Sequence, residues 1–493
     1  MKQRIYEIIS DRQQVLGFGI LTGLFVLLNL ITITWTPLPW LDEVWFIDTA
    51  VNFALNGSWT TTAQLSFGGE TPIALYPPLY QYLLAGWIKL GGFSILSVRS
   101  FNIFIAAIVS IVLFKGLRKL NHLKSWYTIL IFVFLFWGTG LFSWSYRNGR
   151  PDMVNILCSV LFLYSYFMYL KRGYGKWKMW LTVVFVLLSG LQACPFIVTV
   201  LIYVYFIRKE YRSRTKIAFF ITILGFMTGI CLLWGHFIYH NHPRSFFWQF
   251  SHSATISQVL HKIPFLSEFI SPEPGVYNAV SEFLDCYLKN KNYAILTLVN
   301  IFVLSLLLFK NKTKKHSIEV FFLGFSFLMP AVMFLAGHCL SPYTWMFYLP
   351  SVIVCIICLE KQNHIFLKGI YGILTVLFTV ISGLPKSLAE SDRSAHTRIT
   401  QFIEKQNFKK DVVLLSSYSV YYPIREITKN SYYPVYPARY LPPKIEYILK
   451  DETDQYRGEY DNFDQYIMEQ GNKLIPVDSL AQPKIVLYKV APN

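Results

Sequence analysis

The chain has 493 residues, of which 54% are hydrophobic, 17% aromatic and only 15% charged. This composition excludes a series of soluble domains, a disordered chain and a fibrous repeat. Charge-free apolar runs recur from residue 15 to residue 385, several of them 17 to 22 residues long. Because a helix needs roughly 20 apolar residues to cross a bilayer, the sequence predicts a polytopic membrane protein.

The net charge of +17 is spread over short connections and does not form one basic surface. Half of the basic residues, 22 of 45, lie with only five acids in or beside six segments: 1–12, 115–124, 171–178, 208–216, 310–315 and 361–368. Such basic connections face the cytoplasm under the positive-inside rule. The pattern predicts a multi-pass protein of an inner or plasma membrane with a cytoplasmic N-terminus, and it leaves no basic surface for nucleic acid.

The apolar runs predict eleven membrane spans in chain order. They are 15–35, 94–114, 125–146, 152–170, two within 179–207, 217–239, 293–309, 318–337, 343–359 and 365–384. The run 179–207 counts twice because a single helix of that length would extend about 43 Å. Both of its flanks are basic and therefore cytoplasmic, so the chain must turn back around Ser189-Gly190 and Cys194-Pro195.

Two connections on the predicted outer side are longer than the others, a first loop at 36–93 and a large loop at 240–291. Within the first loop, residues 42–55 have apolar side chains at helical spacing, and a second helix is predicted at 78–90. We expect both helices to lie along the membrane surface.

The composition changes after residue 385. Residues 386–493 carry 15 basic and 14 acidic residues. Strand-like segments at 412–416 and 484–490 alternate with helix-like segments at 394–406 and 463–470. The sequence therefore predicts a mainly α-helical membrane domain at 1–385, followed by a small soluble α/β domain on the outer side.

An acidic pair, Asp42 and Glu43, opens the first predicted outer helix. Acids in a first helical turn are favoured by the helix dipole, and this alone would explain the pair. The functional interpretation is a general base beside a second carboxylate that tunes or orients it.

A tight turn between two predicted spans contains Arg147, Arg150 and Asp152. Asp152 follows a proline and could cap the next helix. The two arginines lie on the side that the positive-inside rule disfavours, at the level of lipid headgroups. Because a guanidinium suits a phosphate, a phospholipid or a phospholipid-linked substrate is their natural partner.

A third polar cluster leaves the membrane on the predicted outer side, with Trp248 close behind it. It consists of His236, His240, His242 and Arg244. Histidines four residues apart are compatible with a divalent metal ion, but no carboxylate motif accompanies them. Contacts to a phosphate, and ordinary polar residues at the membrane interface, are the alternatives.

Four segments resemble the N-terminal signature of the GT-C glycosyltransferases, which include protein O-mannosyltransferases and lipid A aminoarabinose transferases. They are LDEVWFIDTAVNFALNG at 41–57, YPPLYQYLLAGW at 76–87, GGFS at 91–94 and VRSFN at 98–102. At position 76, where aminoarabinose transferases carry a lysine, this chain has Tyr76. The resemblance covers residues 35–170 in sequence and the region up to 385 in topology.

The resemblance implies transfer of a sugar, with inversion, from a polyprenyl-phosphate donor on the outer face. It implies that Asp42 is the base, with Glu43 beside it, and that Asp152 is the second outer-side carboxylate. Arg147 and Arg150 then lie where the leaving phosphate is held. Further candidates for the phosphate are Arg244, His240 and His242, and candidates for the donor and acceptor pocket are Tyr76, Trp45 and Trp248.

The sequence predicts no cofactor with certainty and leaves a divalent metal ion open. The acceptor would be a lipid, a glycan or a protein of the cell envelope. Two other functions compete with a single-sugar transferase: a flippase or transporter of lipid-linked saccharides, and a polysaccharide polymerase or ligase. Charged residues that gather at one edge of the membrane, and not within the spans, favour chemistry over transport.

Overall fold

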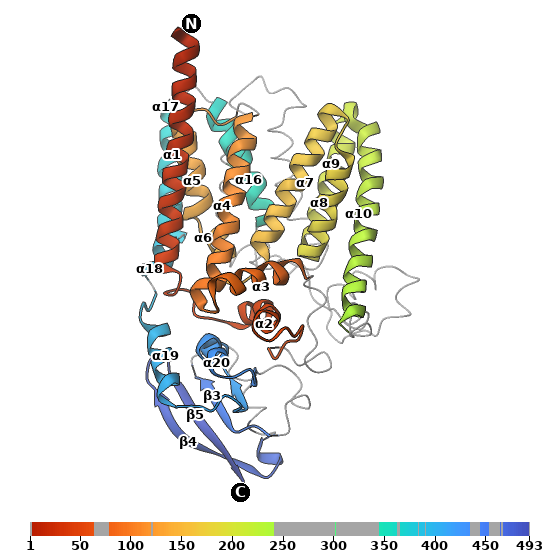
Figure 1. Ribbon diagram of the computed structural model, residues 1–493. Coiled ribbons are helices and arrows are strands. Elements are labelled where there is room, and N and C mark those ends of the chain that lie inside the picture. The colour runs from red at the N-terminus through yellow and green to blue at the C-terminus, as the bar shows by residue number, and fades with distance from the viewer. Residues whose placement is uncertain are drawn as a thin grey trace.

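The computed structural model describes residues 2–63, 78–119, 122–240, 301, 345–361, 365–382, 384–389, 391–433, 444–452, 464 and 467–492. These residues form a bundle of long helices with a smaller α/β domain at one end (Figure 1). The predicted spans at 318–337 and, apart from residue 301, at 293–309 lie outside the described residues.

The bundle consists mainly of apolar helices. They are α1 (Lys2–Thr32), α4 (Ile95–Lys119), α5 (Trp126–Val133), α6 (Gly140–Tyr146), α7 (Asp152–Arg172), α8 (Lys176–Ser189), α9 (Cys194–Ile207), α10 (Arg212–Tyr239), α16 (Trp345–Lys361) and α17 (Ile365–Ser382). In the described part of the chain, four helices are long and apolar enough to cross a membrane. Large apolar side chains on α1 and α10, such as Leu16 and Phe220, are exposed, as expected of surfaces that face lipid. The prediction of a multi-pass membrane protein is confirmed, and the number of spans stays a prediction.

The run 179–207 folds as two short helices, as predicted. Helix α8 ends at Ser189, a 3-10 turn covers Leu191–Ala193, and α9 begins at Cys194 with Pro195 in its first turn. The break has a local cause, because Gly190 has an extended backbone (φ 168°, ψ 129°) and Pro195, which has no N–H to donate, is favoured in the first turn of a helix.

The predicted span 125–146 is not one continuous helix. It consists of α5, a π-helical turn at Phe134–Gly138 and α6, and Thr139 between the last two is extended. The break lies where α17 packs closely, since a Cβ atom on Gly138 would lie 2.4 Å from Cγ2 of Thr379. This contact is made by a residue 241 positions away, so a local pattern does not reveal it.

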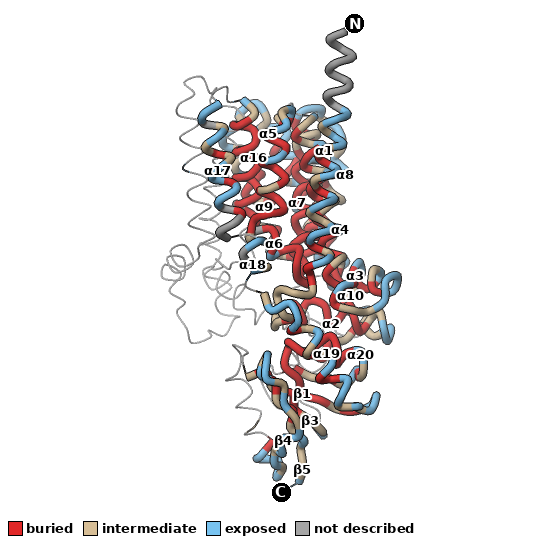
Figure 2. The backbone as a smooth tube through the Cα atoms, turned by 90° about the vertical axis from the view of Figure 1, so that its left-hand side faces the viewer, coloured by how far each residue is buried: buried red, intermediate tan, exposed pale blue. Residues whose placement is uncertain are grey.

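Helices α2 (Leu41–Asn56) and α3 (Leu79–Gly91) lie across the end of the bundle (Figure 1), and the sequence predicted both within two residues. Helix α2 differs from a surface helix in its burial. Every residue from Phe46 to Asn52 is buried, because the C-terminal domain covers the side that faces away from the bundle (Figure 2). Helix α2 is therefore packed between the two parts of the protein.

The C-terminal domain contains the predicted α/β elements. Its helices are α19 (Ala395–Lys405) and α20 (Tyr421–Ile427), which follow the short helix α18 (Leu384–Ala389), and its strands are β1 (Leu414–Ser416), β2 (Ser431–Tyr432), β3 (Tyr447–Asp451), β4 (Asn472–Leu480) and β5 (Ile485–Pro492). The sheet has the order β2-β1-β3-β5-β4, parallel around β1 and antiparallel around β5. Apolar residues of α19 and α20 pack with β1 and β5 in one core, which includes Ile399, Ile424 and Leu414. This core orients α20 toward α2.

Helix α10 packs on α8 through small residues spaced four apart. A Cβ atom added to Gly225 would lie 2.8 Å from Cγ1 of Val183, and one added to Gly229 would lie 3.1 Å from Leu187. Small residues at this spacing allow two helix backbones to approach closely within a membrane.

We expect Gly225→Leu to separate α8 from α10 and to destabilise the protein by about 1–3 kcal/mol, because overpacking forces the backbones apart. The measurement is thermal unfolding of the purified protein in detergent. The matched control is Gly235→Leu on the same helix, where an added Cβ atom meets nothing within 4 Å. A melting temperature that falls equally for both variants would contradict this packing.

Candidate active site

Two groups of residues predicted to carry chemistry lie close together at the bundle end that faces the C-terminal domain. They come from the start of α2 and from the turn between α6 and α7, and residues of α4 and α20 that were not predicted join them there (Figure 1). Segments far apart in the sequence thus contribute to one cluster.

Glu43 and Arg99 form a fully buried, two-pronged ion pair. Nε of Arg99 donates to Oε1 of Glu43 at 2.7 Å, and NH2 donates to Oε2 at 2.6 Å. Oε1 also accepts the Gly149 amide at 3.1 Å and the Tyr422 hydroxyl at 2.9 Å. Because the carboxylate accepts four hydrogen bonds, Glu43 holds α2, α4, the α6–α7 turn and the C-terminal domain together.

Arg147 binds the end of α1 and the chain that follows it. Its NH1 group donates to Asn29 and Thr32 at 2.7 and 3.0 Å, and its NH2 group donates to the carbonyls of Thr32 and Thr36 at 2.7 and 3.2 Å. Both terminal nitrogens are therefore occupied by groups of the protein, and the side chain is buried.

The backbone of the α6–α7 turn is held by two other buried side chains. Nδ2 of Asn102 donates to the carbonyls of Asn148 and Arg150 at 2.6 and 2.8 Å, and the Tyr80 hydroxyl donates to the carbonyl of Gly149 at 2.7 Å. Gly149 lies directly on α2, where a Cβ atom would come within 2.4 Å of Cγ2 of Ile47. These contacts fix the position of the turn relative to α2.

Arg150 joins the two remaining carboxylates. Its Nε donates to Oδ2 of Asp152 at 2.8 Å, and its NH1 pairs with Oδ2 of Asp42. The guanidinium also lies 4.8 Å from the ring centre of Phe46. A buried cation therefore occupies the space between Asp42 and Asp152.

The two carboxylates bound to Arg150 differ in exposure. The Asp42 side chain is 30% exposed, whereas Asp152 is fully buried. Burial raises the pKa of Asp42, and the charge of Arg150 opposes that rise. Asp42 is therefore the carboxylate of this group that an incoming molecule can reach.

Trp45, three residues after Asp42, lies on the same face of α2. In the described part of the chain its indole N–H has no hydrogen-bond partner.

The alternative that Asp152 is only a helix cap does not fit its contacts. Pro151 is the N-cap residue of α7, and no side chain caps this helix. Oδ2 of Asp152 accepts a hydrogen bond from Arg150 and not from a backbone N–H of the helix. Its Oδ1 lacks a hydrogen-bond partner among the described residues. Asp42 and Glu43 do lie in the first turn of α2, so the dipole contribution applies to them in addition to their ion pairs.

The predicted histidine cluster is described only in part. Nδ1 of His236 and Nε2 of His240 each lie 3.2 Å from the hydroxyl of Tyr82 on α3, and Trp59 stacks on Tyr82 at 4.5 Å between ring centres. The remaining predicted residues, His242, Arg244, Trp248 and Tyr76, lie outside the described residues.

Asp42 and Asp152 share a cation of the protein itself, Arg150. Within the described ranges, no three His, Cys, Asp or Glu side chains are grouped as ligands. The divalent metal ion that the sequence left open stays a prediction.

The C-terminal domain supplies contacts to α2 that the sequence did not indicate. Oδ1 of Asp48 accepts the Tyr421 hydroxyl at 2.8 Å, and Arg425 donates to Oδ1 of Asn52. Oδ2 of Asp48 accepts the amide of Thr62 at 2.6 Å, so the same carboxylate holds the chain that follows α2. Two signals in the sequence could have indicated this part of the site: Arg99, a cation within the predicted span 94–114, and the Tyr421-Tyr422 pair.

Two comparisons place this fold among known proteins. Residues 76–238 match the family model of dolichyl-phosphate-mannose-protein mannosyltransferases. The chain is similar to the structure of ArnT from Cupriavidus metallidurans bound to undecaprenyl phosphate, with 9% identity, a TM-score of 0.61 and coverage of 96% of this chain and 97% of that chain. It is also similar to the Archaeoglobus fulgidus oligosaccharyltransferase in complex with Zn and sulfate, with 11% identity, a TM-score of 0.54 and coverage of 95% and 73%. Among curated proteins, none matches the chain.

The fold similarity extends over nearly the whole chain, and the family match covers the segment from α3 to α10. The chain therefore shares the fold of these membrane enzymes, and residues 76–238 match a mannosyltransferase family model. Both findings agree with the resemblance to GT-C glycosyltransferases noted in the sequence.

We expect Arg99→Met to destabilise the protein by about 3–5 kcal/mol, because the change leaves the Glu43 charge buried without its partner. Thermal unfolding in detergent measures the loss. The double variant Glu43→Gln with Arg99→Met removes both charges and should recover a large part of it. The control is Arg208→Gln, which breaks a partly exposed pair with Glu210 at 3.0 Å and should cost about 1 kcal/mol or less. Equal losses in Arg99→Met and in this control would contradict the role of the buried pair.

Proposed function

We propose that this protein is an inverting glycosyltransferase that moves a sugar from a polyprenyl-phosphate donor to an acceptor at the end of the bundle where α2 lies. The observation that carries the proposal is the partly exposed carboxylate of Asp42, held by the buried Arg150 next to Asp152. The fold supports it, because ArnT, a structure of similar fold, was solved with undecaprenyl phosphate bound.

In this proposal Asp42 is the general base. It takes the proton of an acceptor hydroxyl or amine as the acceptor atom bonds to the anomeric carbon of the sugar. The bond between that carbon and the phosphate oxygen breaks on the opposite side, and the polyprenyl phosphate leaves with the electron pair. Attack opposite the leaving group inverts the anomeric carbon. A raised pKa suits this step, since a stronger base accepts the proton more readily.

Arg150 orients Asp42 and keeps a positive charge near the reacting atoms. The charge that develops on the leaving phosphate needs cations, and in the proposal Arg150 shares this work with His240 and with the predicted residues His242 and Arg244. Glu43 and Asp152 act on Asp42 indirectly: Glu43 positions α2, and Asp152 positions Arg150. Trp45, on the same face of α2, borders the acceptor side, together with the predicted pocket residues Tyr76 and Trp248.

The proposed reaction takes place on the outer side of the membrane. Among the described residues, the basic segments at the end of α4, between α7 and α8 and at the start of α10 lie at the opposite end of the bundle from α2 and the C-terminal domain (Figure 1). This supports a cytoplasmic N-terminus and an outer C-terminal domain under the positive-inside rule. The acceptor is a lipid, a glycan or a protein of the cell envelope.

Turnover in lipid vesicles tests the proposed class of reaction. Purified full-length protein is reconstituted with a panel of polyprenyl-phosphate sugars and offered an acceptor extract from cell envelopes. We expect release of free polyprenyl phosphate from at least one donor, and only when acceptor is present. Movement of the donor between leaflets without release would contradict a transferase and support a flippase.

The pH dependence of turnover tests the pairing of Asp42 with Arg150. Asp42 acts as a base only when deprotonated, so kcat/KM should fall as the pH drops through its pKa. Arg150 opposes the rise of this pKa, so Arg150→Gln should raise the pKa further and move the acidic limb of the profile to higher pH. The control is Arg208→Gln, at the other end of the bundle. An acidic limb that stays in place, or moves to lower pH, in Arg150→Gln would contradict the pairing.

A further inference from the structure

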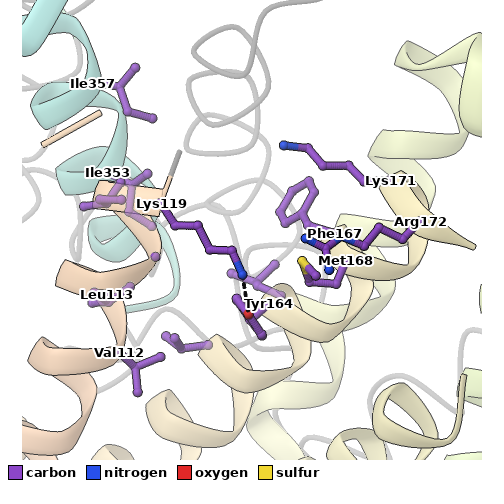
Figure 3. Close-up of a pocket in the computed structure, with 14 residues that line it drawn as sticks. Val112, Leu113, Lys119, Tyr164, Phe167, Met168, Lys171, Arg172, Ile353 and Ile357 are labelled. Atoms are coloured by element: carbon purple, nitrogen blue, oxygen red, sulfur yellow. Dashed lines mark hydrogen bonds between the residues drawn. The ribbon is translucent and has the colours of Figure 1, made fainter. Parts of the chain in front are cut away.

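A second site lies at the end of the bundle opposite to Asp42. The last turns of α4 and α7, together with α16, enclose a cavity of about 290 Å³ (Figure 3). Asp152 begins α7 and Phe167 lines the cavity, and 15 helical residues between them extend roughly 22 Å. The cavity is therefore separate from the candidate active site.

The wall of the cavity is apolar and its rim is basic. Most lining residues are apolar: Val112, Leu113, Leu117, Val160, Leu163, Phe167, Met168, Ile353 and Ile357. The charged residues that line it are Lys119, Lys171 and Arg172, and no acid is among them. Figure 3 shows Lys119 and Lys171 reaching from α4 and α7 toward the space between these helices. A cavity of this kind complements a molecule with an apolar body and an anionic head.

In the described part of the chain, the partners of these cations are neutral. Among the described residues, none of them forms an ion pair. Nζ of Lys119 lies 3.4 Å from the hydroxyl of Tyr164, and NH1 of Arg172 donates to the hydroxyl of Tyr174 at 2.6 Å. These neutral partners leave the positive charge available to a ligand, and Lys and Arg bind phosphate groups well.

We propose that this cavity binds an anionic glycerophospholipid, with the phosphate at Lys119, Lys171 and Arg172 and the acyl chains against the apolar wall. The basic end of the bundle is the end expected at the cytoplasmic leaflet, where anionic lipids attract basic residues. Inorganic phosphate would leave the apolar wall uncovered. A donor with its phosphate at Asp42 cannot place that phosphate here, because the two ends of α7 are too far apart. The site is thus a lipid site distinct from donor binding.

Lipid retention by the purified protein tests the proposal. The full-length protein is exchanged into detergent with added phosphatidylglycerol or phosphatidylcholine, and bound lipid is counted by native mass spectrometry. We expect about one phosphatidylglycerol per protein to be retained in preference to phosphatidylcholine. The charge reversal Lys171→Glu with Arg172→Glu should reduce this retention about tenfold. Lys176→Glu with Lys178→Glu is the matched control, because these exposed lysines lie at the same end, outside the cavity.

A second variant tests the apolar part and keeps the charges. Gly116 lines the cavity, and a Cβ atom there would meet nothing within 4 Å, so Gly116→Phe should fill the space without disturbing the packing. We expect this variant to keep its melting temperature and to lose the lipid. The proposal is overturned if the charge-reversal variant retains phosphatidylglycerol as the control does, or if Gly116→Phe retains it. It is also overturned if the lipid that the wild type carries and the variants lose is a polyprenyl phosphate. The readout is independent of sugar transfer, so it stands or falls apart from the proposed function.

Discussion

The buried ion pair between Glu43 and Arg99 is the interaction on which the rest of the site depends. Two charges removed from water cost several kcal/mol each unless their hydrogen-bonding groups are satisfied. Here the carboxylate accepts four hydrogen bonds from α4, the α6–α7 turn and the C-terminal domain. If one of these elements moved away, the buried Glu43 carboxylate would lose a hydrogen bond that offsets its removal from water. The pair therefore specifies how α2 sits on the bundle, and with it where Asp42 points.

The adjacent carboxylates Asp42 and Glu43 have different tasks because their surroundings differ. Glu43 is buried and fully bonded, whereas Asp42 is partly exposed and held by one cation, Arg150. Arg150 in turn is held by Asp152, whose other oxygen has no partner among the described residues. Glu43 thus organises the site, and its neighbour Asp42 is free to react. The difference comes from their surroundings and not from the residue type.

The C-terminal domain is part of this arrangement as well as a cover for it. Tyr421 and Tyr422 on α20 donate to Asp48 and Glu43 of α2. A domain that bonds to two carboxylates of α2 stabilises the first outer segment from the side opposite the bundle. Motion of the C-terminal domain and the geometry around Asp42 are consequently linked.

Local patterns predicted the elements of the fold well. The apolar periodicity of 42–55 and 78–90 gave α2 and α3, and the flanking charges of 179–207 gave the turn between α8 and α9. Each of these features depends on neighbours in the sequence. The break at Thr139 lies instead beside a contact between Gly138 and Thr379 of α17, and the burial of α2 involves a domain more than 300 residues away. No window of sequence contains both partners of such contacts.

The candidate site was also predictable only in part. The residues with unusual placement, Asp42, Arg150 and Asp152, could be selected because charge is costly at the edge of a membrane. Their protein partners could not, since nothing in the sequence pairs Arg147 with Asn29 and Thr32 of α1. Sequence reasoning thus found some of the side chains that gather, and the structure added Arg99 and Tyr422 and the pairs that they form.

The most direct test of this account compares Asp42→Asn with Glu43→Gln in one experiment, with melting temperature and donor turnover measured on the same preparations. Asp411→Asn, a change at an exposed position of the C-terminal domain, is the control for both. The account predicts that Asp42→Asn melts like the wild type and loses turnover at least 100-fold, in line with the loss of a general base. It predicts that Glu43→Gln melts at a lower temperature. Turnover of Asp42→Asn equal to that of the wild type would contradict the account.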